Sequence, residues 1–313
     1  SDFGNVSVMV SEDSAPGNDG SGVSSTWITG TQAGPQQSVT TEQNSLMIEP
    51  FMDSLAVQAL LEILNPDIGL AGAGELIQAA SKDVGKSEEV LLDALSELLI
   101  DDPRPKLAKN PNDIADGLDF WINAGNFLKR TEIHNRIIEL ETAIDDQNLT
   151  LTSLVNLSQS DIETQAHNNI AYRYALVNLN PFAVVGADYS SFNQDGKLDI
   201  YDPATGDGQL SDKYLTYRTE MLSFLIEKSI NDGANQSIIR FEDKASGEVV
   251  LQQGLNAPQL GVVFGSEQGE ELNGTSFPDS RGDKFNDRLY GMGGNDTLLC
   301  GVLSAEIIMN EAA

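Results

Sequence analysis

Two adjacent nine-residue windows near the C-terminal end of the sequence share one pattern. They are residues 282–290 (GDKFNDRLY) and 291–299 (GMGGNDTLL). Each begins with glycine, has Asn-Asp at its fifth and sixth positions and has leucine at its eighth. Glycine suits a crowded backbone or a positive φ angle, and an aspartate in a turn can direct a carboxylate toward a calcium ion. If each leucine points inward from a short strand, successive windows can stack as a parallel β-roll.

The second window resembles the calcium-binding repeat of the RTX (repeats-in-toxin, haemolysin-type) family, whose pattern is G-G-x-G-x-D-x-U-x. It departs from that pattern at Met292, and the window before it lacks the second and fourth glycines. An earlier window at 265–273 keeps the leading glycine and the leucine, and it has Glu270 where the family has aspartate. The register slips by one residue between this earlier window and Gly282.

The resemblance implies calcium ions that lie between consecutive turns, bound by aspartate carboxylates and by backbone carbonyl groups. It makes Asp287 and Asp296 the main expected carboxylate ligands and Glu270 a weaker one. The expected backbone ligands are Gly282, Asn286, Gly291, Gly293, Gly294 and Asn295. The alternative is a series of turns without metal, because Gly, Asn and Asp are also the ordinary residues of turns.

The acidic composition favours a cation as the partner. The chain has 48 acidic and 18 basic residues and a formal charge of -30, which disfavours nucleic acid and anionic membranes as electrostatic partners. Between Gly265 and Leu299, seven carboxylates accompany three basic side chains. Their mutual repulsion opposes folding until an ion neutralises it, so folding and calcium binding would be one event. Elsewhere in the chain, acidic residues are also explained by solubility.

The RTX resemblance further implies a secreted, extracellular bacterial protein that leaves the cell unfolded and folds outside it with calcium. Its expected partners are calcium ions and the type I secretion machinery, and its oligomeric state stays open. The single cysteine, Cys300, excludes an internal disulfide, and no run of about 18 apolar residues predicts a membrane span. The chain does not begin with methionine and the glycine-rich windows stop after Leu299, so we expect a fragment of a longer protein.

The sequence predicts an α+β fold: a mainly helical domain, then a small antiparallel sheet, then a short parallel β-roll of the RTX nonapeptide type. The predicted segments are a loop and strand segment that would end a missing upstream domain (1–48), a helical domain (49–232), a small β-sheet or hairpin (233–264), the calcium-binding repeats (265–301) and an irregular tail (302–313). Apolar residues at helical spacing predict helices at 53–64, 75–80, 87–98, 113–121, 128–144, 160–178 and from Asp212 to about residue 230.

Two local patterns refine this prediction. Ser160 and Glu163 have the spacing of a capping box at the start of the 160–178 helix. Residues 238–242 and 248–251 predict a β-hairpin, and 259–265 predicts a third strand beside it. We expect this small sheet to cover the open N-terminal end of the roll.

Residues 191–202 are a second, weaker candidate for calcium. They place oxygen-bearing side chains at positions 1, 3, 5, 9 and 12 and glycine at position 6 of a twelve-residue EF-hand-like loop. The loop has no predicted entering helix, and Pro203 disfavours an exiting one. The alternative is a hairpin with a turn at 193–196. The candidate ligands are Asn193, Asp195, Asp199 and Asp202.

No catalytic motif is present in the sequence. His134 and His167 lack the spacing of a zinc site, and we predict that both are solvent-facing helix residues. Residues 53–203 resemble, less specifically, the region between a lipase-like domain and the repeats of large RTX proteins. The alternative function is therefore the C-terminal part of a secreted RTX lipase or esterase, a hydrolase whose active site lies upstream or is lost. A pore-forming toxin is a third hypothesis, which no basic amphipathic segment supports.

Overall fold

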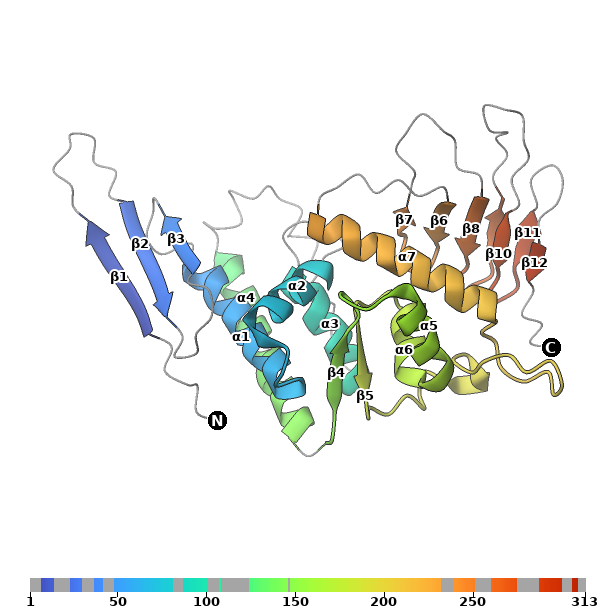
Figure 1. Cartoon of the computed structure of the whole chain (residues 1–313), viewed down its shortest axis with the longest axis horizontal. Coiled ribbons are helices and arrows are strands. Elements are labelled where there is room, and N and C mark those ends of the chain that lie inside the picture. Colours follow the sequence, from blue (N-terminus) through green and yellow to red (C-terminus); the bar gives the residue numbers. More distant parts are fainter. Residues whose placement is uncertain are drawn as a thin grey trace, which may run out of the picture.

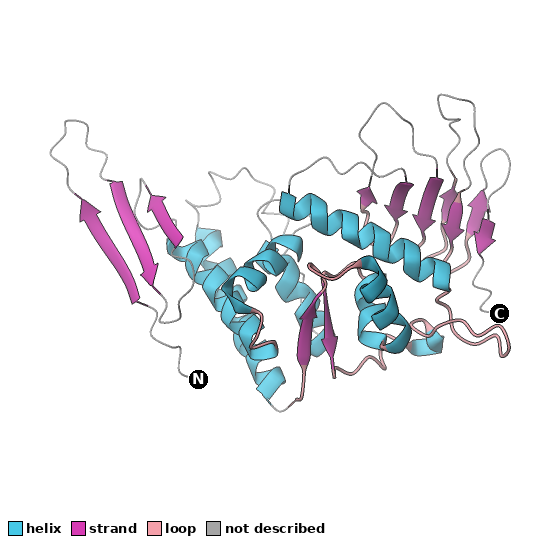
Figure 2. Cartoon of the chain, viewed as in Figure 1, coloured by secondary structure: helices cyan, strands magenta, loops and turns pink. Residues whose placement is uncertain are grey.

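The computed structural model combines helices and small sheets in one chain. It describes residues 7–13, 23–29, 37–41, 48–80, 87–100, 107, 124–145, 147–231, 239–250, 260–274, 287–299 and 306–308. The helices lie in the middle of the molecule and strands lie at both ends (Figures 1 and 2). The predicted mixture of α and β structure is therefore confirmed.

The first half of the helical region contains four helices whose apolar faces meet. Helices α1 and α3 both contact α4, and α2 contacts α1 and α3. Leu60, Leu91, Leu95 and Leu140 are fully buried where these helices pack. All four helices overlap predicted ones and begin or end one to six residues further out, and the predicted helix at 113–121 lies outside the described residues. The bounds are α1 (Ile48–Leu64), α2 (Gly69–Ala80), α3 (Ser87–Leu99) and α4 (Ala124–Asp145).

The predicted 160–178 helix is two helices, α5 (Gln159–Asn168) and α6 (Ile170–Val177). Asn169 lies between them in an extended conformation (φ -144°, ψ 123°), and its side chain accepts a hydrogen bond from the N–H of Ala171 at 2.9 Å. It caps a new helix because asparagine competes with helical hydrogen bonds. The predicted capping box was also wrong by two residues. The cap is Ser158, whose hydroxyl accepts from the N–H of Asp161 at 3.2 Å.

Two short strands, β4 (Thr150–Ser153) and β5 (Phe182–Val185), were not predicted. They pair antiparallel, with Leu151 opposite Val184, and both of these side chains are buried. Helix α7 (Asp212–Asn231) follows and begins at the predicted residue. Together, α1 to α7 with β4 and β5 form what we call the helical body.

The C-terminal strands form a five-stranded sheet and a separate pair. The order in the five-stranded sheet is β12-β10-β8-β6-β7, and the pair is β11-β9. The predicted hairpin is present as the antiparallel β6–β7 pair, but β8 runs parallel to β6, so the predicted antiparallel sheet is in fact mixed. The bounds are β6 (Ile239–Asp243), β7 (Val249–Val250), β8 (Leu260–Phe264), β9 (Glu271–Asn273), β10 (Arg288–Tyr290), β11 (Thr297–Leu299) and β12 (Glu306–Ile308).

A further, three-stranded sheet lies at the N-terminal end of the chain (Figure 1). Strands β1 (Ser7–Asp13), β2 (Val23–Thr29) and β3 (Gln37–Thr41) pair antiparallel in the order β1-β2-β3. The sequence predicted a loop and strand segment here, and the structure has three strands in it.

Three aromatic rings join α7 to the C-terminal sheet, which lies alongside it in Figure 1. Phe264 ends β8 and Tyr290 ends β10, and their rings stack with centroids 5.3 Å apart and an interplanar angle of 13°. The ring of Tyr214, on α7, meets both of them edge-on at 5.3 Å. Burial of Tyr214 raises the pKa of its hydroxyl to about 12. Helix α7 therefore packs against the ends of two neighbouring strands of the sheet.

A buried ion pair also connects α7 to the C-terminal sheet. The guanidinium of Arg218, on α7, donates to Asp243 Oδ1 at 2.7 Å, and both side chains are only 2% exposed. Its other nitrogens donate to the backbone carbonyls at the end of α6, Leu176 O at 3.0 Å and Val177 O. The guanidinium also lies 4.5 Å from the ring centroid of Phe264. One arginine thus connects α6, α7, β6 and β8.

Candidate functional site

The glycine-rich windows form two stacked strand–turn–strand units. The first unit is β8, residues 265–270 (the first turn) and β9. The second unit is β10, residues 291–296 (the second turn) and β11. Each strand of the second unit runs parallel to its counterpart in the first, with Val262 opposite Arg288 and Glu271 opposite Thr297, an offset of 26 residues in both cases.

The backbones of the two turns contact each other directly. The N–H of Gly293 donates to Ser266 O at 3.1 Å, and the N–H of Thr297 donates to Glu270 O at 2.7 Å. Neighbouring turns in this stack are therefore held at hydrogen-bonding distance, which is close enough for one ion to touch both.

The aliphatic eighth positions point inward between the units. Leu272 and Leu289 are fully buried together with Val263, in a small core separate from that of the helical body. Leu298 packs against this core and is partly buried. The prediction that the leucine of each window points inward is confirmed for Leu289 and holds in part for Leu298.

The sixth-position carboxylates accept backbone hydrogen bonds from the preceding unit. Asp296 Oδ1 accepts from the N–H of Glu270 at 3.0 Å. Asp287 Oδ1 accepts from the N–H of Gly261 at 3.1 Å, and Asp287 is 2% exposed. In both bonds the donor and the acceptor are 26 residues apart in sequence, so each aspartate links its own unit to the preceding one in the same way. The carboxylate of Glu270 instead turns back to its own turn, where it accepts from the N–H of Ser266 at 2.8 Å and from the Ser266 hydroxyl.

The predicted glycine positions make room for carboxylate and carbonyl oxygens. A Cβ atom on Gly291 would lie 2.7 Å from Asp296 Oδ2, and one on Gly293 would lie 2.7 Å from Glu267 Oε2. Gly294 has φ +91°, and a Cβ there would lie 2.5 Å from the carbonyl carbon of Gln268. Gly294 therefore requires glycine for steric reasons, whereas a Cβ on Gly291 or Gly293 would push a carboxylate oxygen away from the turn.

Met292 is the residue that departs from the family pattern, and its backbone explains why glycine would fit there. Its φ angle is +66°, in the left-handed region that non-glycine residues rarely adopt. Its side chain packs on the core of the helical body, which offsets the cost of that backbone conformation.

The backbone carbonyls of the second turn face the first turn. Gly291 O lies 2.3 Å from where a Cβ on Gly265 would be, and Asn295 O lies 2.8 Å from where a Cβ on Gly269 would be. Both residues were expected to supply backbone ligands, and both place their carbonyl oxygens between the turns. Gly282 and Asn286 lie outside the described residues.

The twelve residues of the two turns carry three carboxylates, on Glu267, Glu270 and Asp296, and no basic side chain. The sequence reasoning missed Glu267, although it follows the leading glycine of its window by two residues. One cation reaches it from the helical body, because the ammonium of Lys197 forms an ion pair with Glu267.

The donor set suits calcium in kind. Calcium is bound by six to eight oxygens, from carboxylates, carbonyls and water. The turns offer carboxylates, carbonyl oxygens and spaces that side chains other than glycine would fill. In the described parts of the chain, no group of three or more His, Cys, Asp or Glu side chains is close enough together to hold a metal ion. Carbonyl oxygens would therefore have to complete the coordination.

Three of the four candidate ligands of the 191–202 loop form local hydrogen bonds. The Asn193 amide donates to Asp199 Oδ1 at 3.1 Å and accepts from the N–H of Leu198 at 2.8 Å. Asp202 Oδ1 accepts from the N–H of Ala204 at 2.8 Å. Asp195 has φ +59° within a short 3-10 turn, η3 (Gln194–Gly196). The loop has no entering helix, as expected, and the structure brings Asn193 and Asp199 together.

The two histidines are exposed on helices, as predicted. His134 Nε2 lies 3.0 Å from Asp53 Oδ1, and its side chain is 47% exposed. His167 Nε2 lies 3.9 Å from Asp212 Oδ1. Among the helices that the structure describes, none is long and apolar enough to cross a membrane.

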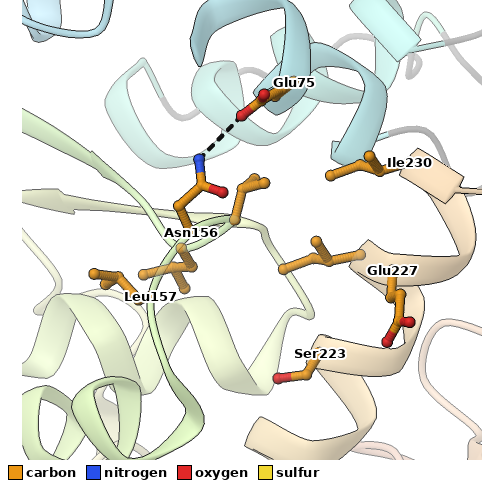
Figure 3. A pocket seen from close by; sticks show the side chains of 9 residues that line it. Glu75, Asn156, Leu157, Ser223, Glu227 and Ile230 are labelled. Atoms are coloured by element: carbon orange, nitrogen blue, oxygen red, sulfur yellow. Dashed lines mark hydrogen bonds between the residues drawn. The ribbon is translucent and has the colours of Figure 1, made fainter.

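A groove of about 310 Å³ lies away from the turns, between α2, the segment after β4 and α7 (Figure 3). Leu154, Leu157 and Ile226 line it together with Glu75 and Asn156, whose side chains are joined by a hydrogen bond of 3.0 Å. None of its nine lining residues is a predicted site residue. The groove therefore adds no support to a site at the repeats.

No family model matches this chain, and neither a curated protein nor a solved structure matches it. The functional interpretation of the turns consequently depends on their sequence pattern and on the contacts described above.

Proposed function

We propose that the first and second turns bind calcium, as RTX-type nonapeptide repeats on a short parallel β-roll. The supporting observation is the pairing of Asp296 with the N–H of Glu270 across two turns whose glycines leave space for oxygens. Asp296 and Glu270 are the proposed carboxylate ligands in the present arrangement, and Gly291 and Asn295 supply carbonyl oxygens. The carboxylate of Glu267 would join them by moving away from Lys197.

Calcium would supply the positive charge that this segment lacks. Three carboxylates lie on twelve turn residues without a basic side chain, so the turns repel each other when no cation is present. A divalent ion between them offsets that repulsion, and the free energy of binding becomes free energy of folding. The proposal therefore includes calcium-dependent ordering of the two units.

The setting that we propose is a secreted bacterial protein, exported unfolded by type I machinery and folded outside the cell. Extracellular calcium is abundant enough for a site of modest affinity, since extracellular calcium modules have dissociation constants of roughly 10⁻⁴ to 10⁻³ M. The turns would then stay unfilled during export and fill afterwards.

Equilibrium dialysis with ⁴⁵Ca²⁺, together with calcium-titrated circular dichroism, tests the proposal. We expect wild-type protein to bind calcium near millimolar concentration and to gain β structure as it does so. Asp296→Asn should weaken binding by at least about tenfold, because it removes a charged ligand. Asp67→Asn is the matched control on an exposed residue of the helical body and should leave binding unchanged.

Two results would refute the proposal. One is the absence of bound calcium in the wild-type protein at about 10 mM, well above the range expected for such modules. The other is equal binding by the Asp296→Asn variant and the wild type. Turnover of a p-nitrophenyl ester by the same protein would instead favour the hydrolase alternative.

A further inference from the structure

The ion pair between Lys197 and Glu267 joins the two sequence motifs that stood out separately. Lys197 belongs to the 191–202 loop, and Glu267 belongs to the first turn, 70 residues later. The ammonium group of Lys197 in the 191–202 loop thus contacts the carboxylate of Glu267 in the first turn.

Several contacts hold the backbone of the loop around Lys197 in place. Gly196, before it, has φ +70° and lies against Gly208, and Asn193 bonds both to Leu198 and to Asp199. Arg173, on α6, donates from Nε to Leu198 O. The ammonium of Lys197 is therefore directed from a fixed support on the helical body.

The contact lies where the two turns meet. Glu267 Oε2, which accepts from Lys197, is also the oxygen that occupies the space above Gly293 of the second turn. The same pair borders a pocket of about 300 Å³ between the helical body and the first turn, which Met292 of the second turn also lines. Lys197 thus places a positive charge in direct contact with a carboxylate of the stacked turns.

We propose that Lys197 is a built-in counter-ion that competes with calcium for the stacked turns. This inference rests on the proposed calcium binding and adds its regulation. Without calcium, the ammonium neutralises Glu267 and holds the first turn against the helical body. Calcium displaces the ammonium from Glu267, so binding at the repeats frees the side chain of Lys197. The lysine thereby lowers the calcium affinity and links the repeats to the 191–202 loop.

Calorimetric calcium titration of three variants tests the inference. Lys197→Gln should bind calcium about three- to tenfold more tightly than the wild type, because one competing charge is gone. Lys197→Arg keeps the charge and should stay close to the wild type. Lys244→Gln is the matched control, since Lys244 also pairs with a glutamate, Glu242, outside the turns. It should change the affinity by less than about twofold, because its ammonium pairs with Glu242 and not with a carboxylate of the turns.

A second measurement uses the unmodified chain. Acetylation of lysine amines by an N-hydroxysuccinimide ester, read by peptide mass spectrometry, should be faster at Lys197 in calcium than in EDTA. Lys244 should react at the same rate in both. This measurement does not depend on whether a variant folds.

The outcomes separate the two proposals. No calcium binding by the wild type refutes the proposed function. Binding by the wild type with equal or weaker affinity in Lys197→Gln refutes only the role of Lys197, as does a Lys197 acetylation rate that calcium leaves unchanged. Tighter binding in Lys197→Gln but not in Lys244→Gln supports it.

Discussion

Replacing Arg218 by methionine should remove much of the stability of this chain, because Arg218 is the charged group at the joint between the helical body and the C-terminal sheet. Its guanidinium has three acceptors, Asp243 Oδ1 and the carbonyls of Leu176 and Val177. Methionine can fill similar space but cannot donate to any of them. The change would leave a carboxylate that is 2% exposed without its cationic partner.

The expected cost follows from that burial. Removing one partner of a buried ion pair costs about 3–5 kcal/mol, whereas an exposed pair contributes about 0–1 kcal/mol. Asp243 keeps hydrogen bonds from the N–H and hydroxyl of Ser246, so we expect the lower half of that range, about 3–4 kcal/mol. Such a loss is a large share of the total stability of a typical domain, which is about 5–15 kcal/mol.

Urea unfolding followed by circular dichroism at 222 nm, in EDTA, measures this loss. Arg240→Met is the matched control, because Arg240 lies on β6 and pairs with Glu242, and these two side chains are 26% and 18% exposed. The control should lose about 1 kcal/mol or less. A cycle of Arg218→Met with Asp243→Asn should give a coupling energy of at least about 1.5 kcal/mol. A loss in Arg218→Met no larger than the loss in Arg240→Met would refute the reasoning.

Two further predictions concern the backbone and the pH dependence of stability. Gly247→Ala meets no atom within 4 Å and should cost about 1 kcal/mol for its positive φ angle alone, whereas Gly294→Ala also drives a Cβ into Gln268 and should cost at least about 2 kcal/mol. Equal unfolding midpoints for the two variants would contradict this. Burial raises the pKa of the Glu88 and Glu220 carboxyl groups, so the stability that they contribute is present at low pH and lost as the pH rises through the folded pKa values. The free energy of unfolding in EDTA should therefore rise from pH 7 to pH 5, and less so in Glu88→Gln with Glu220→Gln; a flat profile would contradict the shifts.

The helical part of the fold was predictable because its information is local. Buried residues recur at the spacing of one helix face in α3 and α7, so the sequence alone indicates both helices. The interruption at Asn169 is local too, but asparagine is compatible with both a helix interior and a cap. The residue alone therefore does not decide between a continuous helix and a cap.

The strands were less predictable because their partners are distant. Strand β4 has a short Thr-Leu-Thr pattern, and its partner β5 begins about thirty residues later, after two helices. The direction of β8 is also not encoded in its own residues. A strand after a long connection can pair in parallel with the hairpin strand β6, whereas a short connection would have required an antiparallel pair.

The candidate site was predictable in its residue types but not in its pairing. Glycine, aspartate and leucine at fixed positions indicated a turn that needs glycine, a carboxylate acceptor and an inward side chain, and the second turn has all three. The contacts with Lys197 and Arg218 were not predictable, because both come from the helical body, whose docking on the turns no local pattern encodes.

Adjacent nine-residue windows are not the units that stack on each other in this structure. Strands β10 and β12 pair with Leu289 opposite Ile307, an offset of 18 residues, which is two windows. Strands β8 and β10 pair with an offset of 26, so eight further residues lie in that connection. One nine-residue window is therefore half of a stacking unit. The turns of two successive windows lie at opposite ends of the strand between them. Asp287 directly precedes β10, whereas Asp296 comes after β10 at the end of the second turn and directly precedes β11, so the two aspartates lie at different ends of β10. In the proposed site, a cation at Asp296 would therefore be shared with Glu270, whose N–H donates to Asp296 across the stack, and not with Asp287, which is nine residues away.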